Sequence, residues 1–383
     1  MKSISAAILF TLVINLTVQA QQHERYRHLS DTTLVSKHLG FPKNITVTVP
    51  IEWQPDIDKT FPLIIIFDRQ NRRSHDYIIR TIDYLTSNEQ MPSSVIMSVE
   101  STPENRIRET LHLASDARGM AVETERFVFE ELIPLAERKF QASKFRLLIG
   151  HSRYGYFTTS LLRSKTDDIN AIISLSPFFG QKNVNLVDSL KTLMSKSLEH
   201  SIFYRYGIGN EFPDDFEKMD AALKSNTNPR FDAKGTHFRE ADHNVTPGLI
   251  VGGALYDIFE KWSEIQAKYI SNDALDLGDI GKLDQEIVET YGEPIPFALG
   301  ILNGKGWHFY NLGQFDQAAE AWELLVERYP NFSEAYLFII DAQISNKKDA
   351  SKARAQFLES ISTSRLYSPE EKIELMVEFE RMK

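Results

Sequence analysis

Cysteine is absent from this chain of 383 residues. Without thiols the protein forms no disulfides, has no cysteine nucleophile and offers no thiolate to a metal or a lipid. Positive charge is also in short supply, because 43 lysines and arginines stand against 53 aspartates and glutamates, for a formal net charge of −10. This surplus of negative charge argues against binding nucleic acid or anionic lipid by long-range attraction. After residue 20, no apolar run is long enough to span a bilayer.

The first twenty residues have the composition of a secretory signal peptide. A basic start at Lys2 leads into the apolar residues 4–18, and the small residue Ala20 follows. We expect cleavage after Ala20 and bacterial-type export to the periplasm or the medium. An uncleaved membrane anchor is the alternative, disfavoured because the apolar stretch is short and contains Asn15 and Thr17.

Residues 21–271 alternate short apolar runs with amphipathic helical patterns, which is typical of an α/β sheet. Residues 61–67 are apolar throughout, as expected of a central strand covered on both faces. Other strands are expected at residues 44–51, 94–99, 145–149, 171–174 and 201–206. Helices are expected at residues 77–87, 121–140 and 248–268.

Residues 272–383 have a different character, helical and without strand signals, after a polar linker at 271–281. Small and aromatic residues fit the helix–turn–helix pattern of a tetratricopeptide (TPR) repeat: Gly306, Gly313, Phe315, Ala318, Ala319, Trp322, Leu325 and Pro330. Ala353 and Phe357 repeat Ala318 and Trp322 about 35 residues later. A generic helical hairpin is the alternative. Fewer than three repeats do not fold alone, so this TPR-like module should pack against the α/β domain or a partner, including a second copy.

Residues 147–156, Leu-Leu-Ile-Gly-His-Ser-Arg-Tyr-Gly-Tyr, are the most informative segment. An apolar run ends in Gly150-His151-Ser152, and a helical pattern follows directly. A strand, a sharp turn and a helix form the context of a nucleophile elbow, in which the turn presents a serine and the glycine leaves room for backbone. The usual pattern is Gly-x-Ser-x-Gly, but here Tyr154 holds the second glycine's place and Gly155 comes one residue late. Ser152 is the predicted nucleophile.

A serine hydroxyl needs a base to take its proton, and the base needs an acid to orient it. On α/β-hydrolase folds these groups follow in the order serine, acid, histidine. His243 lies between the strand-like residues 236–240 and the helix expected at 248, so it is the predicted base at a strand's carboxyl end. His237, inside that strand, is interpreted as a packing or solvent-facing histidine.

The acid should follow the strand at residues 201–206. Glu211 is the first carboxylate there and the favoured choice, with Asp214 and Asp215 as alternatives. The two aspartates also suit the first turn of the next helix, because acids favour helix N-termini.

Backbone amides must also receive the oxyanion of the tetrahedral intermediate. The amide of Arg153, directly after the nucleophile, is one predicted donor. The loop after residues 61–67 should supply the other, with the Arg69 amide favoured and Gln70 next.

These segments and their order resemble the Putative esterase family of α/β-hydrolases, which includes S-formylglutathione hydrolase (esterase D) and the ferric-enterobactin esterases. The similarity covers about Asn44 to Trp262. Residues 105–110, Asn-Arg-Ile-Arg-Glu-Thr, also resemble the Arg-x-Arg-Asp loop beside the active site in the siderophore-esterase-like branch. The resemblance implies an α/β-hydrolase sandwich with a mostly parallel sheet. It also implies hydrolysis of a small-molecule carboxylic ester through an acyl-enzyme, without a metal or organic cofactor.

The chain departs from this family beside the nucleophile. The family usually has Gly-His-Ser-Met/Leu-Gly-Gly, whereas Arg153 and Tyr154 follow Ser152 here. Arg153 either pairs with an anionic group of the substrate or forms a salt bridge with a neighbouring acid. Arg106, Arg108 and Tyr154 are the predicted substrate contacts, with solvated loop charges as the alternative for the two arginines.

We therefore predict a serine esterase with a TPR-like C-terminal module. Two other functions use the same features. An inactive hydrolase fold could serve as a binding module, with the helical tail as its interaction surface. An acyltransferase would use the same site while excluding water.

Overall fold

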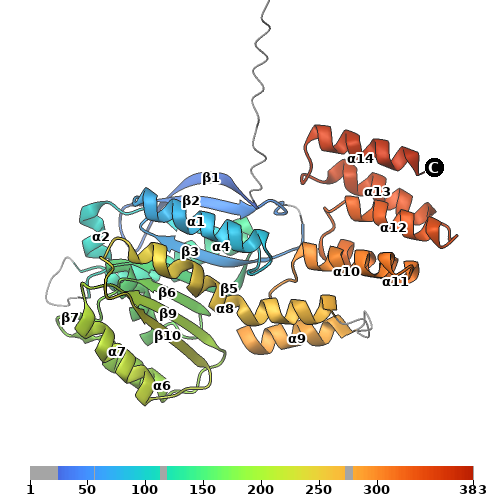
Figure 1. Ribbon diagram of the computed structural model, residues 1–383. Helices are drawn as coiled ribbons and strands as arrows, with labels where there is room; N and C mark the ends of the chain where they lie inside the picture. The colour runs from blue at the N-terminus through green and yellow to red at the C-terminus, as the bar shows by residue number, and fades with distance from the viewer. Residues whose placement is uncertain (1–24, 56, 113–118, 272–278, 383) are drawn as a thin grey trace, which may run out of the picture.

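A computed structural model describes residues 25–55, 57–112, 119–271 and 279–382. The expected signal peptide and most of the predicted linker lie outside these residues. The centre is an eight-stranded sheet in the order β1-β2-β4-β3-β5-β6-β9-β10 (Figure 1). Strands β1 and β2 are antiparallel to their neighbours, and the other pairs are parallel. The strands are β1 (Tyr26–Val35), β2 (Pro42–Pro50), β3 (Phe61–Phe67), β4 (Val95–Val99), β5 (Ala142–His151), β6 (Ala171–Leu175), β9 (Ile202–Ile208) and β10 (Phe231–His237), and β7 (Gly180–Gln181) pairs with β8 (Val184–Asn185) in a separate hairpin.

Strand β3 lies in the middle of the sheet and is apolar at every position. All seven of its residues are buried. Successive side chains point to opposite faces, so Leu63 and Ile65 join one core while Ile64 and Ile66 join the other. The strand expected at residues 61–67 is confirmed. Strand β1 was not predicted from the sequence, because this edge strand is largely polar and only one of its residues is buried.

Helices cover both faces of the sheet, as predicted. Helices α1 and α8 pack on one face, and α3, α4, α5, α6 and α7 lie on the other. The helix expected at 121–140 is continuous but contains a π-helical turn, Phe127–Leu132. The helices of this part are α1 (Arg72–Ser87), α2 (Pro103–Glu109), α3 (Ala121–Arg126), α4 (Ile133–Phe140), α5 (Arg153–Ser160), α6 (Leu186–Met194), α7 (Pro213–Ser225) and α8 (Thr246–Ser271).

The carboxyl ends of six parallel strands, β3, β4, β5, β6, β9 and β10, meet along one edge of the sheet. Neighbouring strands are in register near these ends, with Ile66 of β3 beside Ile149 of β5, and Leu175 of β6 beside Gly207 of β9. The loops that leave these strands therefore lie next to one another. Catalytic groups gather at this edge in open α/β sheets.

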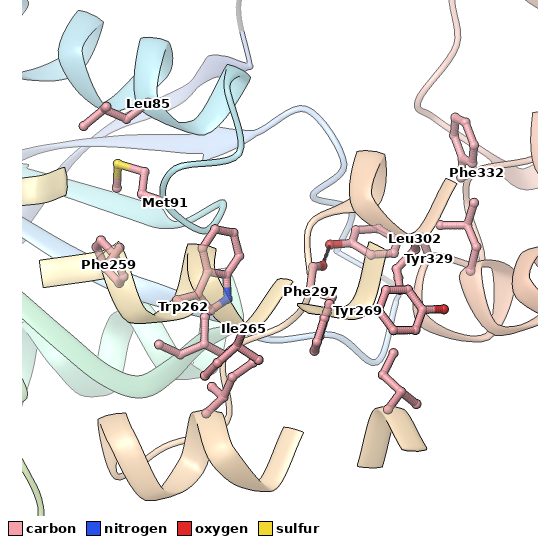
Figure 2. Packing of buried hydrophobic residues seen from close by; sticks show 14 of the residues in the cluster. Leu85, Met91, Phe259, Trp262, Ile265, Tyr269, Phe297, Leu302, Tyr329 and Phe332 are labelled. Atoms are coloured by element: carbon pink, nitrogen blue, oxygen red, sulfur yellow. Dashed lines mark hydrogen bonds between the residues drawn. The ribbon is translucent and has the colours of Figure 1, made fainter. Parts of the chain in front are cut away.

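The helical C-terminal region shares a hydrophobic core with the α/β domain. Trp262 and Tyr269 of α8 belong to one buried cluster with Phe297, Leu302 and Tyr329 (Figure 2). Trp262 also donates from its indole nitrogen to the carbonyl of Pro296 at 3.2 Å. The region consists of α9 (Ile280–Tyr291), α10 (Leu299–Asn311), α11 (Phe315–Arg328), α12 (Glu334–Ser345), α13 (Ser351–Thr363) and α14 (Pro369–Arg381). No helix in the described residues is both long and apolar enough to cross a membrane.

A chain that ends after Ser271 should lose its cooperative fold. Trp262, Ile265 and Tyr269 would then lose their partners in the helical region. Each large apolar side chain contributes about 1.5–3 kcal/mol by burial, and a domain's total stability is only about 5–15 kcal/mol. Thermal unfolding followed by circular dichroism would check this. A truncated chain that melts within a few degrees of the full chain would contradict it.

Candidate active site

Ser152 occupies a strained turn between β5 and α5. Its backbone has φ 58° and ψ −113°, in a region that non-glycine residues rarely adopt. Its amide donates to the carbonyl of Leu175 at 2.7 Å, which ties the turn to the end of β6. A Cβ atom at Gly150 would collide with the carbonyl of Tyr154, so glycine is needed for the first turn of α5 to approach the strand. The predicted sharp bend at Ser152 is present.

His243 and Glu211 meet at the neighbouring strand ends. The Nδ1 atom of His243 lies 3.1 Å from Oε1 of Glu211. Burial opposes ionisation of Glu211, but hydrogen bonds from its own amide, the Ser176 hydroxyl and His243 outweigh it and lower the pKa of the carboxyl group. A carboxylate in this position holds the imidazole with its Nδ1 atom as the donor.

The alternative acids do not face this histidine. Asp214 and Asp215 lie in the first turn of α7, as their structural interpretation predicts. Asp215 accepts a hydrogen bond from the amide of Phe179 at 3.4 Å. His237 is the last residue of β10, and its ring stacks on Phe216 at 4.8 Å between centroids, which agrees with a packing role.

His151 connects the histidine loop to the elbow. Its Nε2 atom lies 3.0 Å from the carbonyl oxygen of His243, and the two rings are 4.8 Å apart. A carbonyl can only accept, so Nε2 of His151 carries the hydrogen. Burial lowers the pKa of His151, which favours the neutral ring. Sequence reasoning set His151 aside as a base because it adjoins Ser152, and it missed this bracing role.

The structure thus gathers the elbow, His243 and Glu211 at one edge of the sheet. Within the described part of the chain, the hydroxyl of Ser152 makes no hydrogen bond to His243 or to any other side chain. Catalytic hydrogen bonds are often long before substrate binds and tighten in the complex.

The two predicted oxyanion donors differ in their surroundings. The Arg153 amide is at the first position of α5, where it has no acceptor within the helix. The Arg69 amide instead donates to the carbonyl of Val99 at 3.1 Å, because the turn at Asp68, with φ 64°, directs it to the end of β4. Its single hydrogen is therefore occupied. The Gln70 amide, the second choice, has no acceptor among the described residues.

Arg106 joins the two loops that flank the serine. Its guanidinium makes two hydrogen bonds of 2.7 Å to Asp68 and one of 3.0 Å to the carbonyl of His151. This side chain, predicted to contact substrate, is therefore occupied by protein groups. Arg108, the other predicted contact on α2, makes no side-chain hydrogen bond to any described residue.

The structure corrects the prediction for Tyr154. Its side chain is 1% exposed and points away from the elbow's surface, so it cannot contact substrate. The ring stacks on Phe67 at 4.6 Å between centroids, and its hydroxyl lies 2.8 Å from Ser101 Oγ and also donates to Glu109. Burial and the Glu109 carboxylate raise the pKa of Tyr154 well above its ordinary value.

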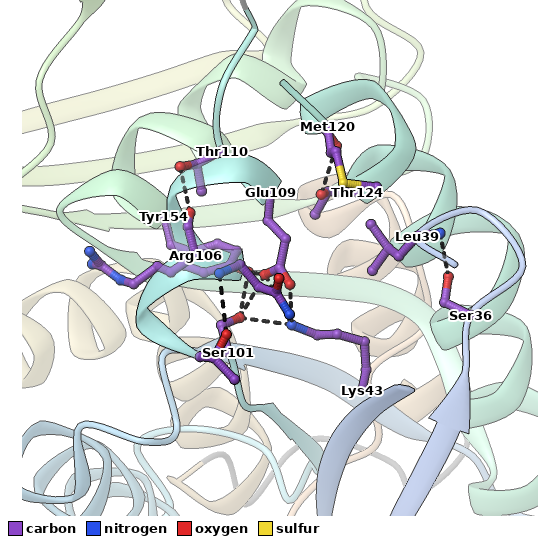
Figure 3. Close-up of polar contacts among 12 residues, drawn as sticks. Ser36, Leu39, Lys43, Ser101, Arg106, Glu109, Thr110, Met120, Thr124 and Tyr154 are labelled. Carbon is purple, nitrogen blue, oxygen red and sulfur yellow. Dashed lines mark hydrogen bonds and ion pairs between the residues drawn. The ribbon is translucent and has the colours of Figure 1, made fainter. Parts of the chain in front are cut away.

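Tyr154 belongs to a buried polar network with Lys43, Ser101 and Glu109 (Figure 3). The ammonium of Lys43 lies 2.8 Å from Oε1 of Glu109 and 2.8 Å from Oγ of Ser101. The side chains of both members of the ion pair are almost fully buried, at 3% and 0% exposure. Tyr154 takes the place of the family's glycine because this network and Phe67 accommodate its ring and hydroxyl.

Arg153 has no ion-pair partner in the described residues. Its side chain is partly buried, and burial followed by the charge of Arg106 lowers its pKa. Of the two interpretations of this residue, the salt bridge to a neighbouring acid is absent from the described part of the protein. The described residues also contain no cluster of three or more histidines and carboxylates that could hold a metal ion.

The mostly parallel eight-stranded sheet, with a serine on a strained strand–helix turn, defines an α/β-hydrolase. A family model described as Putative esterase matches residues 36–243, more than half of the chain. The protein belongs to this esterase family.

Solved structures share the fold at low sequence identity. An uncharacterised protein from Capnocytophaga ochracea is 13% identical with a TM-score of 0.59, over 93% of this chain and 100% of that one. An IroE-like serine hydrolase from Shewanella oneidensis is 15% identical with a TM-score of 0.63, over 79% of this chain and 99% of that one. No curated protein matches this sequence.

Proposed function

We propose that the protein is a serine carboxylic-ester hydrolase in which Ser152, His243 and Glu211 form a catalytic triad. The observation that carries the proposal is the 3.1 Å contact between His243 and Glu211. His151, the residue before Ser152, also donates a hydrogen bond to the backbone carbonyl of His243. Membership of the esterase family supports the same reaction. An inactive binding module would have no need of an oriented histidine beside a strained serine.

The reaction has two halves. Ser152 attacks the ester carbonyl while Nε2 of His243 accepts its proton, and Glu211 stabilises the resulting imidazolium. The amides of Arg153 and Gln70 donate to the oxyanion, with Gln70 in place of Arg69. The C–O bond to the alcohol breaks as His243 returns the proton to the leaving oxygen. Water then attacks the acyl-enzyme with the same assistance, releasing the acid and Ser152.

A fluorophosphonate probe tests this proposal directly on the full chain. The reagent phosphonylates only a serine that is activated by a base, so we expect mass spectrometry to find the adduct on the peptide that contains Ser152. The Ser152→Ala variant should not be labelled. A matched control is Ser164→Ala, since Ser164 is exposed and its hydroxyl donates to Glu125 far from the elbow. Equal labelling of Ser152→Ala, or no labelling of the parent protein at saturating reagent, would refute the triad.

Export and the helical module belong to the same proposal. The composition of residues 1–20 supports a periplasmic or secreted esterase.

A TPR-like assignment of the C-terminal region is supported by the contact between Gly306 and Trp322, because a Cβ at Gly306 would collide with the indole ring. Such a module would offer a surface for a protein partner or a second copy.

A further inference from the structure

The charge of Arg153 is the feature of this site that ester hydrolysis itself does not explain. Arg153 directly follows Ser152 at the first position of α5, so its side chain starts beside the reacting group. It is partly buried and has no carboxylate partner in the described residues. A partly desolvated cation without a counter-charge is unfavourable, because water no longer stabilises it fully and no anion replaces the water.

Two other arginines near the serine are matched by acids. Arg106 is held by Asp68 in a bidentate pair at 2.7 Å. Arg69 lies 3.1 Å from Glu100 and 3.3 Å from Asp31. Arg153 differs from both. In a chain with a net charge of −10, this unmatched cation stands beside the predicted nucleophile.

The two acids of the site are each paired with another residue. Glu211 faces His243, and Asp68 faces Arg106. No described carboxylate lies within ion-pair distance of Arg153, so an anion that reaches it would come with the ligand.

Resting on the proposed esterase function, we propose that the preferred substrate is an ester that carries a carboxylate, and that Arg153 binds this group through a charge-assisted hydrogen bond. A planar guanidinium suits a carboxylate, with two parallel donors in one plane. Bound carboxylate would supply the missing counter-charge. The carboxylate could belong to the acyl part or to the alcohol part of the ester, because either part can reach a cation beside the serine. Experiments can separate these two possibilities.

Two matched substrate pairs distinguish the sources. For the acyl side, 4-nitrophenyl hydrogen glutarate is compared with the neutral 4-nitrophenyl valerate. For the alcohol side, 4-acetoxybenzoate is compared with its methyl ester. In one of the two pairs, we expect kcat/KM of the parent protein to favour the anionic member by roughly 10- to 100-fold, the usual effect of a hydrogen bond to a charged group. Higher salt should reduce this preference.

Variants of Arg153 assign the preference to its side chain. Arg153→Gln should lose the 10- to 100-fold preference, so that its kcat/KM for the anionic ester falls to about the value for the neutral ester. Arg153→Lys should keep part of the preference for the anionic ester, because lysine keeps the positive charge but lacks the bidentate geometry of the guanidinium. The matched control is Arg80→Gln, which removes one exposed positive charge from α1, where Arg80 makes no ion pair with any described residue.

A binding experiment separates this inference from the proposed function. Calorimetry with glutarate and with 4-hydroxybenzoate, on the Ser152→Ala protein with and without Arg153→Gln, requires no turnover. We expect binding of one of the two anions to weaken by roughly 10-fold or more when Arg153 is removed. If the parent protein hydrolyses none of the esters but the anion still binds through Arg153, the proposed esterase function is refuted and the carboxylate site is not. Equal anion binding with and without Arg153, or an unchanged preference in Arg153→Gln, would refute the carboxylate site.

Discussion

Replacing either Ser152 or His243 with alanine should lower kcat for ester hydrolysis by roughly 10⁴-fold or more, and the double variant should lose little more than either single one. The reason is that the two side chains act as one unit, since the hydroxyl is a poor nucleophile without the base and the base has nothing to activate without the hydroxyl. Steady-state kinetics with 4-nitrophenyl acetate would measure this. Glu211→Gln should lose roughly 10²- to 10⁴-fold, since the imidazole loses its orienting charge.

Asp215→Asn is the matched control for the acid. Asp215 lies on the same connection between β9 and β10, but its carboxylate faces the amide of Phe179. The control should keep its activity within a few-fold of the parent protein. The triad would be contradicted if the activity loss of the Ser152→Ala, His243→Ala double variant equalled the product of the two single losses. It would also be contradicted if Asp215→Asn lost as much activity as Glu211→Gln.

Local patterns predicted most of the fold and the chain order of the site. The apolar run at residues 61–67 indicated a strand covered on both faces, and the Gly-His-Ser turn between a strand and a helix indicated Ser152. Glu211 was predicted because it is the first carboxylate after a strand, and in the structure it lies 3.1 Å from His243. The strand and the turn are present in the structure, because the information for them lies within about ten residues of sequence, whereas the catalytic roles of Ser152 and Glu211 stay predictions.

Side-chain direction could not be predicted in the same way. Tyr154 stands beside the nucleophile in the sequence, yet its direction is set by Glu109, Ser101 and Phe67, which come from other parts of the chain. The Arg69 amide is occupied because β4 ends next to it, which depends on the strand order. Such contacts belong to the folded arrangement and leave no local pattern.

The buried pair of Lys43 and Glu109 explains how an elbow without its second glycine remains folded. Strand β2 supplies the cation, α2 supplies the carboxylate, and Tyr154 of α5 hydrogen bonds to that carboxylate. The network therefore joins the helix that follows the nucleophile to two other elements. Burial lowers the pKa of Lys43 although Glu109 opposes this, so the ammonium depends on its counter-charge.

Glu109→Ala should therefore reduce the free energy of unfolding by about 3–5 kcal/mol, because it leaves Lys43 buried without an anion. Urea unfolding at neutral pH would measure the change. Asp188→Ala is the matched control, since it breaks an exposed pair with Lys191 at 3.0 Å, and such pairs contribute roughly 0–1 kcal/mol.

The double variant Lys43→Met with Glu109→Leu should be more stable than Glu109→Ala alone. It removes the unpaired charge and fills the space with apolar groups, which often matches or exceeds the stability of a buried ion pair. Its remaining defect would be the Tyr154 hydroxyl, left with Ser101 as a partner at 2.8 Å. If Glu109→Ala is as mild as Asp188→Ala, or if the double variant is no better than Glu109→Ala, the buried charge does not control the stability of this region.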